Sequence, residues 1–225
     1  MLKINYDETP NWYELDEPAF LIVLHATTSP AKQAIDWLKT TPEDRLRLYG
    51  TKTYSSANAV FSRLGDITEL AGPDRGTWHA GKISNPSERA KKVLRKDFLG
   101  RFKNPNKYSI GLEVAAHWDI DKDGILEGWE KLYSPQAVKS VASYILHLEK
   151  KLGRQFPNHH ILTHKDITSY KPDIEIARAM VLTEIMKQRV AAATELSPAP
   201  IEPVIEPEVD KEATKNEIIK LVKTL

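Results

Sequence analysis

The sequence contains no cysteine, no long apolar run and no surplus of charge of either sign. Without cysteine, disulfides are excluded, and any metal site must be built from His, Asp and Glu. No apolar run approaches the roughly 18 residues of a membrane-spanning helix, so no transmembrane segment is expected. A formal net charge of +1 gives no reason to expect a nucleic-acid partner, because such binding requires a basic surplus gathered on one face.

The N-terminal residues also lack the basic segment and apolar stretch of a signal peptide. We therefore expect the protein in the cytoplasm after synthesis. The 225 residues, with an apolar share of 41%, are enough to bury a sizeable core in one domain. The composition is typical of an ordinary soluble globular protein.

Strand-like and helix-like patterns are mixed along the chain. Short apolar segments predict strands over residues 20–25, 109–115 and 161–164, and residues 58–70 predict a hairpin about a Leu-Gly-Asp turn. Serine-proline pairs at 29–30 and 134–135 predict the starts of two helices, the second ending at Gly153, and a third helix is predicted from near residue 172 through Met186. Residues 84–107 are polar and basic and predict a surface excursion. The predicted fold is a single α/β domain with a central mixed β-sheet flanked by helices.

The composition changes near residue 190. We predict a folded domain over residues 1–190, an extended linker rich in Pro and Glu over 191–213, and a short amphipathic helix over 214–225 that opens with a capping box. The tail helix could contact membrane, cell wall or another copy of the chain. A frayed terminus without a role is the alternative.

Three residues have the types and positions required for a zinc site. Catalytic zinc takes three protein ligands and leaves one position open for water. His25 and His164 each follow an apolar strand directly, so both can reach the same edge of one sheet, and Asp173 follows nine residues after His164. Taken singly, strand-end histidines are commonplace, and Asp173 could simply favour a helix N-terminus.

Four separated segments strengthen this prediction. They are LIVLHATTS, the hairpin SSANAVFSRLGDITEL running into TWHAG, YSIGLEV, and THKDITSYKPD. In sequence, order and rough spacing they resemble the type 2 N-acetylmuramoyl-L-alanine amidases, which include phage lysis amidases, cytoplasmic muropeptide-recycling amidases and peptidoglycan-recognition proteins. The resemblance covers roughly residues 18–188 and implies the same fold, zinc as cofactor and bacterial peptidoglycan as partner.

The resemblance also implies roles for individual residues. It implies His25, His164 and Asp173 as zinc ligands. It implies Glu113 as general base and Lys171 as the group that stabilises developing negative charge. The corresponding segments of the family line the substrate groove at Trp78, His79 and Asn58. For Glu113 the alternative is an outward-facing strand residue, for Lys171 a solvated loop lysine, and for Trp78 and His79 structural support under the groove.

Some positions depart from the family pattern. Asn58 stands where relatives usually have histidine, and Ala57 paired with Glu113 resembles the recycling branch, because other branches place a tyrosine in the hairpin. The loop from His164 to Asp173 is one residue shorter than the common pattern. Asp166 is the nearest substitute ligand if Asp173 is not one.

A second pattern predicts a calcium site. Residues 119–130 place oxygen-bearing side chains at alternate positions around Gly124 and end on glutamate. The predicted calcium ligands are Asp119, Asp121, Asp123, Ile125 and Glu130. A strand precedes this loop where a calcium-binding hand has a helix, and an acidic Asp-Gly hairpin turn is the alternative interpretation.

These patterns predict a peptidoglycan hydrolase that cleaves the amide bond between N-acetylmuramic acid and L-alanine. A phage endolysin that acts on the wall after release through a separate pore is the leading interpretation. The alternatives are a cytoplasmic recycling amidase, a peptidoglycan-binding module without activity, and a calcium-dependent adaptor.

Overall fold

The protein is built on a six-stranded mixed sheet, seen in a computed structural model that describes residues 2–27, 29–115, 133–171 and 174–196. The chain divides after Arg189, and the sheet belongs to the first unit, Met1–Arg189. The sheet has the order β1-β5-β4-β7-β3-β8, and β2 and β6 form a separate pair. The strands are β1 Asn5–Tyr6, β2 Trp12–Glu14, β3 Leu21–Thr27, β4 Ala59–Phe61, β5 Ile67–Glu69, β6 Arg75–Thr77, β7 Ser109–Ala115 and β8 Ile161–Thr163.

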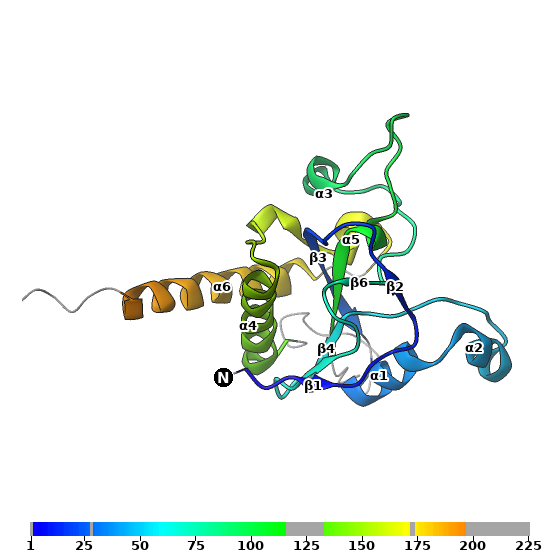
Figure 1. Ribbon diagram of the computed structural model, residues 1–225, viewed down its shortest axis with the longest axis horizontal. Coiled ribbons are helices and arrows are strands. Elements are labelled where there is room, and N and C mark those ends of the chain that lie inside the picture. Colours follow the sequence, from blue (N-terminus) through cyan, green and yellow to red (C-terminus); the bar gives the residue numbers. More distant parts are fainter. Residues whose placement is uncertain (1, 28, 116–132, 172–173, 197–225) are drawn as a thin grey trace, which may run out of the picture. The chain divides into compact units, whose positions relative to one another are not determined.

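Helices cover both faces of this sheet (Figure 1). On one face, α4 and α6 pack their apolar sides against Ile22 and Leu24 of β3 and the matching residues of β7. The other face is covered by α1 and, near β8, by α3 and α5. The helical elements are α1 Ala31–Lys39, α2 Pro42–Tyr49, α3 Glu88–Val93, η1 Pro105–Lys107, α4 Pro135–Leu152, η3 Asn158–His160, α5 His164–Ile167 and α6 Glu175–Leu196.

Three parallel strands set the register of the candidate site. β7 and β8 both pair in parallel with β3, so their carboxyl ends meet at one edge of the sheet. His25 of β3 lies opposite Glu113 of β7, and Leu24 lies opposite Thr163, the last residue of β8. Because the residue after Thr163 is His164, the register alone brings the two predicted zinc-binding histidines side by side.

Most of the predicted elements are confirmed. The hairpin is β4 and β5, the strand over residues 109–115 is β7, and α4 begins at Pro135 and ends at the left-handed Gly153, with Ser134 accepting a hydrogen bond from the Ala137 amide. The central mixed sheet flanked by helices is the predicted fold class.

Other elements differ from the prediction. The helix α1 is capped by Pro30 without a side-chain hydrogen bond. Residues 84–107 include the helix α3, which buries Ala90, and Leu94 just after it is also buried, so part of the predicted surface excursion contributes to the core. The helix α2 was not predicted. The helix α6 extends to Leu196, so residues 191–196 of the segment predicted as linker are helical.

Several predicted features lie outside the described residues. These are Asp173, the calcium pattern over 119–130, and the tail from residue 197. None of the described helices combines the length and the apolar content needed to cross a membrane.

Candidate active site

A polar cleft opens at the carboxyl ends of β3, β7 and β8. Its volume is about 380 Å³, and its walls come from the sheet edge, from α1 and from the chain after α5. The residues of greatest chemical interest among those lining it are His25, Trp37, His79, Glu113, His164 and Lys171. The structure therefore brings four of the five predicted catalytic and zinc-binding residues to one cavity.

The centre of the cleft is the pair His25 and His164. Their Nδ1 atoms are 2.9 Å apart, and the nearer carboxylate oxygen of Glu113 is 3.9 Å from His25 Nδ1. His25 is buried, and the Glu113 side chain is 16% exposed, so that it faces the cleft from the neighbouring strand. All three groups line the same cleft at the carboxyl edge of the sheet.

Hydrogen bonds on the far side of the rings fix which nitrogens carry protons. A backbone carbonyl only accepts, so His164 Nε2, 3.0 Å from the Ala80 oxygen, carries its proton. Burial lowers the pKa of His164 to about 4, with Lys171 adding to the effect, so the ring is neutral near pH 7. His164 Nδ1 therefore has a free lone pair directed at His25.

The His25 tautomer follows from a longer chain. The Ser109 hydroxyl donates to the Pro105 carbonyl, so it must accept from His79 Nε2, 3.0 Å away. Burial lowers the pKa of His79 to about 3, so this ring is neutral and its Nδ1 can only accept, from His25 Nε2 at 3.0 Å. Burial, followed by the neighbouring His164, also lowers the pKa of His25 well below its usual value. The Nδ1 atom of His25 is then unprotonated as well.

Two nitrogen lone pairs thus face each other at 2.9 Å with no proton between them. This arrangement is unfavourable without a cation and suited to one, because two nitrogen ligands of a tetrahedral zinc ion lie about 3.3–3.4 Å apart at normal bond lengths. Among the residues that the structure describes, no three His, Asp or Glu side chains are arranged to hold an ion. The histidine pair therefore fits a metal that takes further ligands, and the predicted one, Asp173, lies outside the described residues.

Glu113 and Lys171 provide the charged groups of the cleft. Burial raises the pKa of Glu113 to about 7, an effect that the positive charge of Lys171 partly offsets. Lys171 is half-buried, its backbone amide donates to the Thr168 carbonyl, and its ammonium group lies 5.8 Å from the Tyr170 ring centre. The carboxyl group of Glu113 and the side chain of Lys171 thus line the same cleft and interact electrostatically.

The residues predicted to line the substrate groove lie in three different settings. His79 is buried, its ring packs directly against Gly111, and both ring nitrogens are bonded within the protein. Asn58 is fully buried, donating to three backbone carbonyls and accepting from Thr77 and the Gly111 amide. Trp78 is half-buried between Tyr13 and Tyr54. Of these three predicted residues, only His79 contributes to the cleft wall.

The chain is similar to known proteins both in its sequence pattern and in its fold. The sequence profile of the N-acetylmuramoyl-L-alanine amidase family Amidase_2 matches residues 15–174. The chain belongs to this family. Comparison with curated protein sequences gives no match. Similar solved structures include a selenomethionine derivative of AmpD, with a TM-score of 0.54 and 18% identity over 80% of this chain and 95% of the other. The PlyG catalytic domain matches with a TM-score of 0.52 and 15% identity over 88% and 99% of the two chains. These likenesses support the fold.

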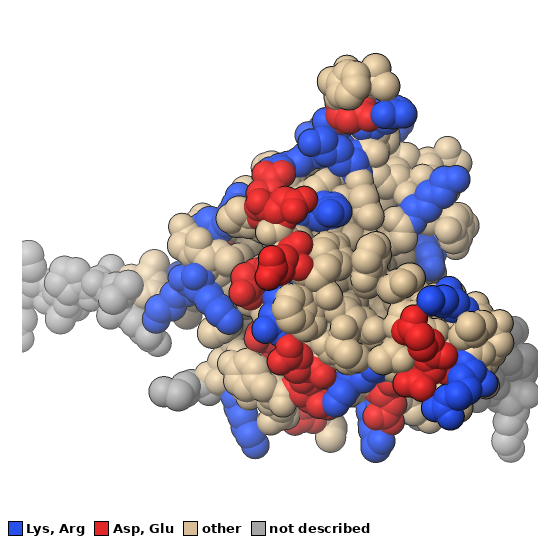
Figure 2. Space-filling model, turned by 45° about the vertical axis from the view of Figure 1, so that its right-hand side comes forward, with Lys and Arg blue, Asp and Glu red and all other residues tan. Residues whose placement is uncertain are grey.

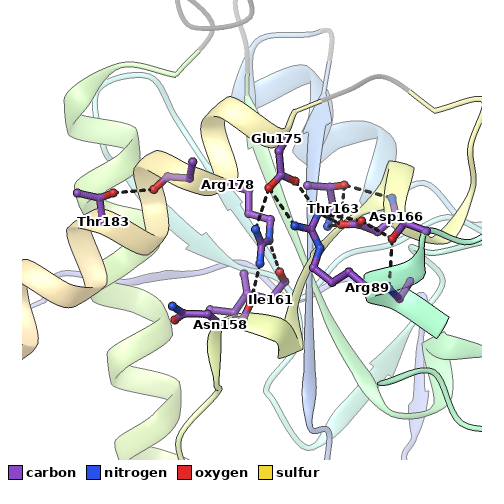
Figure 3. A network of polar contacts seen from close by, with 11 residues as sticks. Arg89, Asn158, Ile161, Thr163, Asp166, Glu175, Arg178 and Thr183 are labelled. Carbon is purple, nitrogen blue, oxygen red and sulfur yellow. Dashed lines mark hydrogen bonds and ion pairs between the residues drawn. The ribbon is translucent and has the colours of Figure 1, made fainter. Parts of the chain in front are cut away.

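In this amidase, a clamp of ion pairs joins Arg89 of α3 to Asp166 and Glu175, which lie on either side of Lys171 in the sequence (Figure 3). Arg89 of α3 donates to both carboxylate oxygens of Asp166 at 2.8 Å and to Glu175 at 2.6 and 3.0 Å. Arg178 donates to Glu175 at 2.8 Å and to the Asn158 carbonyl at 2.7 Å. One guanidinium group therefore ties Asp166 of α5 to Glu175 of α6.

The clamp also bears on the choice between two aspartates as zinc ligand. The Asp166 carboxylate accepts hydrogen bonds from Ser87 and from the Thr163 amide in addition to Arg89, and it is nearly fully buried. Asp166 is not among the residues that line the cleft. Both oxygens of its carboxylate already accept hydrogen bonds within the protein, which favours Asp173 as the predicted third ligand.

Three further residues of the amidase were not singled out from the sequence. Trp37 of α1 lines the cleft, Ser109 fixes the orientation of His79, and the buried Tyr133 donates a long hydrogen bond of 3.4 Å to the His25 carbonyl. Burial, followed by the neighbouring Glu113, raises the pKa of Tyr133 above its ordinary value, so the phenol is neutral. A single sequence carries no signal for these contacts, since each depends on which strands and loops become neighbours.

Proposed function

We propose that this protein is a zinc-dependent N-acetylmuramoyl-L-alanine amidase. The family assignment supports peptidoglycan amide hydrolysis. The observation that carries the zinc proposal is the pair of unprotonated Nδ1 atoms, 2.9 Å apart, beside the carboxylate of Glu113. His25, His164 and Asp173 would hold the ion.

Each residue of the cleft would have a separate role in the hydrolysis. A zinc ion bound there would polarise the attacking water and the scissile carbonyl. Glu113 would accept the proton from that water and return it to the nitrogen of L-alanine as the amide bond breaks. Lys171 would offset the negative charge that develops on the carbonyl oxygen. His79 would keep His25 in the tautomer that leaves Nδ1 free to bind.

The first experiment measures the zinc content of the purified full chain beside a cell-wall digestion assay. The assay scores newly freed amino groups of L-alanine with and without a chelator. A single zinc ion per chain with chelator-sensitive release supports the amidase. Tight wall binding without release would instead favour the non-catalytic binding module.

For the biological role we propose an endolysin that acts on intact wall. The Pro/Glu-rich sequence that follows Leu196 and the amphipathic segment over 214–225 support this, because a tethered helix suits an enzyme that works on a large insoluble substrate. The pairing of Ala57 with Glu113 favours the second candidate, a recycling amidase that acts on soluble fragments.

The two roles differ in substrate preference. Rates on intact sacculi and on a soluble muropeptide are compared for the full chain and for a chain ending at Leu196. An endolysin prefers sacculi and loses part of that preference on truncation. A recycling amidase prefers the soluble fragment in both forms.

A further inference from the structure

One segment of the chain concentrates positive charge that the catalytic cleft does not use. Residues 91–107 contain seven Lys or Arg and a single acidic residue, although the whole chain has a net charge of +1. Four of the seven basic side chains are paired, with Glu88, Glu17, Asp97 and Asp16. Lys92, Lys96 and Lys103 make no ion pair within the part of the chain that the structure describes; we call these three the tip lysines.

At the end of this segment, the turn over residues 97–100 presents two large apolar side chains to solvent. Phe98 is 93% exposed and Leu99 is 60% exposed. The turn projects at the top of Figure 1, and in Figure 2 the uppermost surface is uncharged, with an acidic and several basic side chains below it. We call residues 97–100 the Phe98 tip.

The Phe98 tip is held in this shape by its own hydrogen bonds. The Asp97 carboxylate accepts from the amides of Leu99 and Arg101, both at 2.9 Å, and Gly100 takes a positive φ of 78° that closes the turn. At its base, Lys96 pairs with Phe102, and the Tyr108 hydroxyl bonds the backbone of both arms. The two exposed apolar side chains therefore belong to a hydrogen-bonded hairpin.

We propose that the Phe98 tip docks on the surface of an anionic lipid bilayer. The tip lysines would contact lipid phosphates, and Phe98 and Leu99 would enter the boundary between headgroups and acyl chains. Charge alone would fit any polyanion, but an anionic wall polymer offers no apolar phase, whereas a bilayer offers one next to its phosphates. With two apolar anchors and three cations, the expected binding is weak and reversible.

The test uses flotation of the full chain with vesicles of phosphatidylcholine alone or of an equimolar mixture with phosphatidylglycerol. The wild-type chain should bind the anionic vesicles, less so at high salt, and not the neutral ones. The Phe98→Ser/Leu99→Ser chain should lose at least about tenfold in partition. Replacing the three tip lysines by Gln should lower partition into anionic vesicles about a hundredfold, since each basic group near the membrane surface raises partition about fivefold.

Leu64 provides the matched control. It is 83% exposed on the turn between β4 and β5, so Leu64→Ser removes a comparable apolar side chain and should leave partition unchanged. Hydrolysis of a soluble muropeptide should be the same for all these variants, which checks that they fold.

The absence of cysteine allows the contact to be located directly. Leu99→Cys and Leu64→Cys chains are labelled with a polarity-sensitive fluorophore and mixed with anionic vesicles. A blue shift at position 99 and none at 64 supports insertion of the tip. Equal binding to neutral vesicles, no binding to anionic ones, or full binding by the Phe98→Ser/Leu99→Ser chain overturns the proposal; the last result would move the contact elsewhere, including to residues 197–225.

Discussion

His25 and His79 are joined through Nε2 and Nδ1 at 3.0 Å, on the side of the His25 ring that faces away from His164. The bond uses the one proton of the neutral His25 ring, and it leaves Nδ1 as a lone pair in the cleft. His79 is oriented by Ser109, and its ring fits over β7 because residue 111 is glycine, where a Cβ atom would lie 2.4 Å from the ring. The buried imidazole of His79 thus sets the tautomer of His25, the predicted ligand, without itself being a predicted zinc ligand.

This relationship predicts different effects for two amide substitutions at His79. The Asn amide oxygen lies near the position of Nδ1 and can accept from His25, whereas Gln extends towards Ser109 and leaves His25 without its acceptor. We expect His79→Asn to retain zinc affinity within a few-fold and His79→Gln to lose about 10- to 100-fold. Chelator competition measures the affinity, with His160→Asn as control. Equal losses for Asn and Gln would show that His79 acts only by filling space.

A second prediction concerns Glu113. Replacing it by Gln keeps the shape but removes the proton acceptor, so turnover should fall by about 100- to 10,000-fold while zinc binding is retained. Glu69→Gln is the matched control, because Glu69 is also buried but lies outside the cleft, bonded to Tyr144. A Glu113→Gln chain that remains active would remove Glu113 from the role of base.

A third prediction concerns the clamp at Arg89. Arg89→Ala leaves the buried Asp166 carboxylate without its cation, and we expect the free energy of unfolding in urea to fall by about 2 kcal/mol. Zinc affinity should fall as well, because the helix α5, which carries both His164 and Asp166, loses its bond to Arg89. Arg89→Lys should recover little, since an ammonium group lacks the rigid planar fork through which Arg89 donates to both Asp166 and Glu175. The surface pair of Arg47 with Asp44 serves as control, and Arg47→Ala should change neither quantity. If zinc affinity is unchanged in Arg89→Ala, the clamp serves stability alone.

The sequence predicts the central part of this fold because its signals there are local. A run of branched apolar residues ending at His25, a serine-proline start at residue 134 and a Leu-Gly-Asp turn each specify their element without distant contacts. The helix α2 also has such signals, with Thr41 as N-cap, proline next and Gly50 at its end, and these could have been recognised. The short strands β1, β2 and β6 could not, because two or three residues acquire strand geometry only from the partner that they meet.

In the site, too, some positions follow from local sequence signals and others depend on distant contacts. The positions of His25 and His164 could be inferred from strands that end at histidine. The burial of Asn58 and the acceptor role of His79 could not, since they depend on the loop from β6 crossing β7. Lys171 lies in the cleft as the motif match indicates, but the sequence gives no measure of its effect on Glu113.

A fourth prediction tests the calcium pattern over residues 119–130. If these side chains bind calcium, the ion should raise the melting temperature of the wild-type chain, and replacing Asp123 and Glu130 together should remove that response. Thermal scans with calcium and with magnesium provide the comparison. A calcium response that persists in the doubly substituted chain would place the ion elsewhere.

The last prediction separates the two candidate aspartates through zinc-dependent stability. If zinc binds the folded chain through the His25 and His164 pair as proposed, then at about 100 times its dissociation constant it should raise the melting temperature by roughly 5 to 10 °C. Asp173→Asn should abolish most of this increase while leaving the metal-free melting temperature unchanged. Asp166→Asn should do the opposite, because Asp166 bonds Arg89 and caps α5: the metal-free chain melts earlier but still gains the zinc increment. Retention of the full increment in Asp173→Asn, together with its loss in Asp166→Asn, would exchange the two roles and require the Arg89 clamp to open when the metal binds.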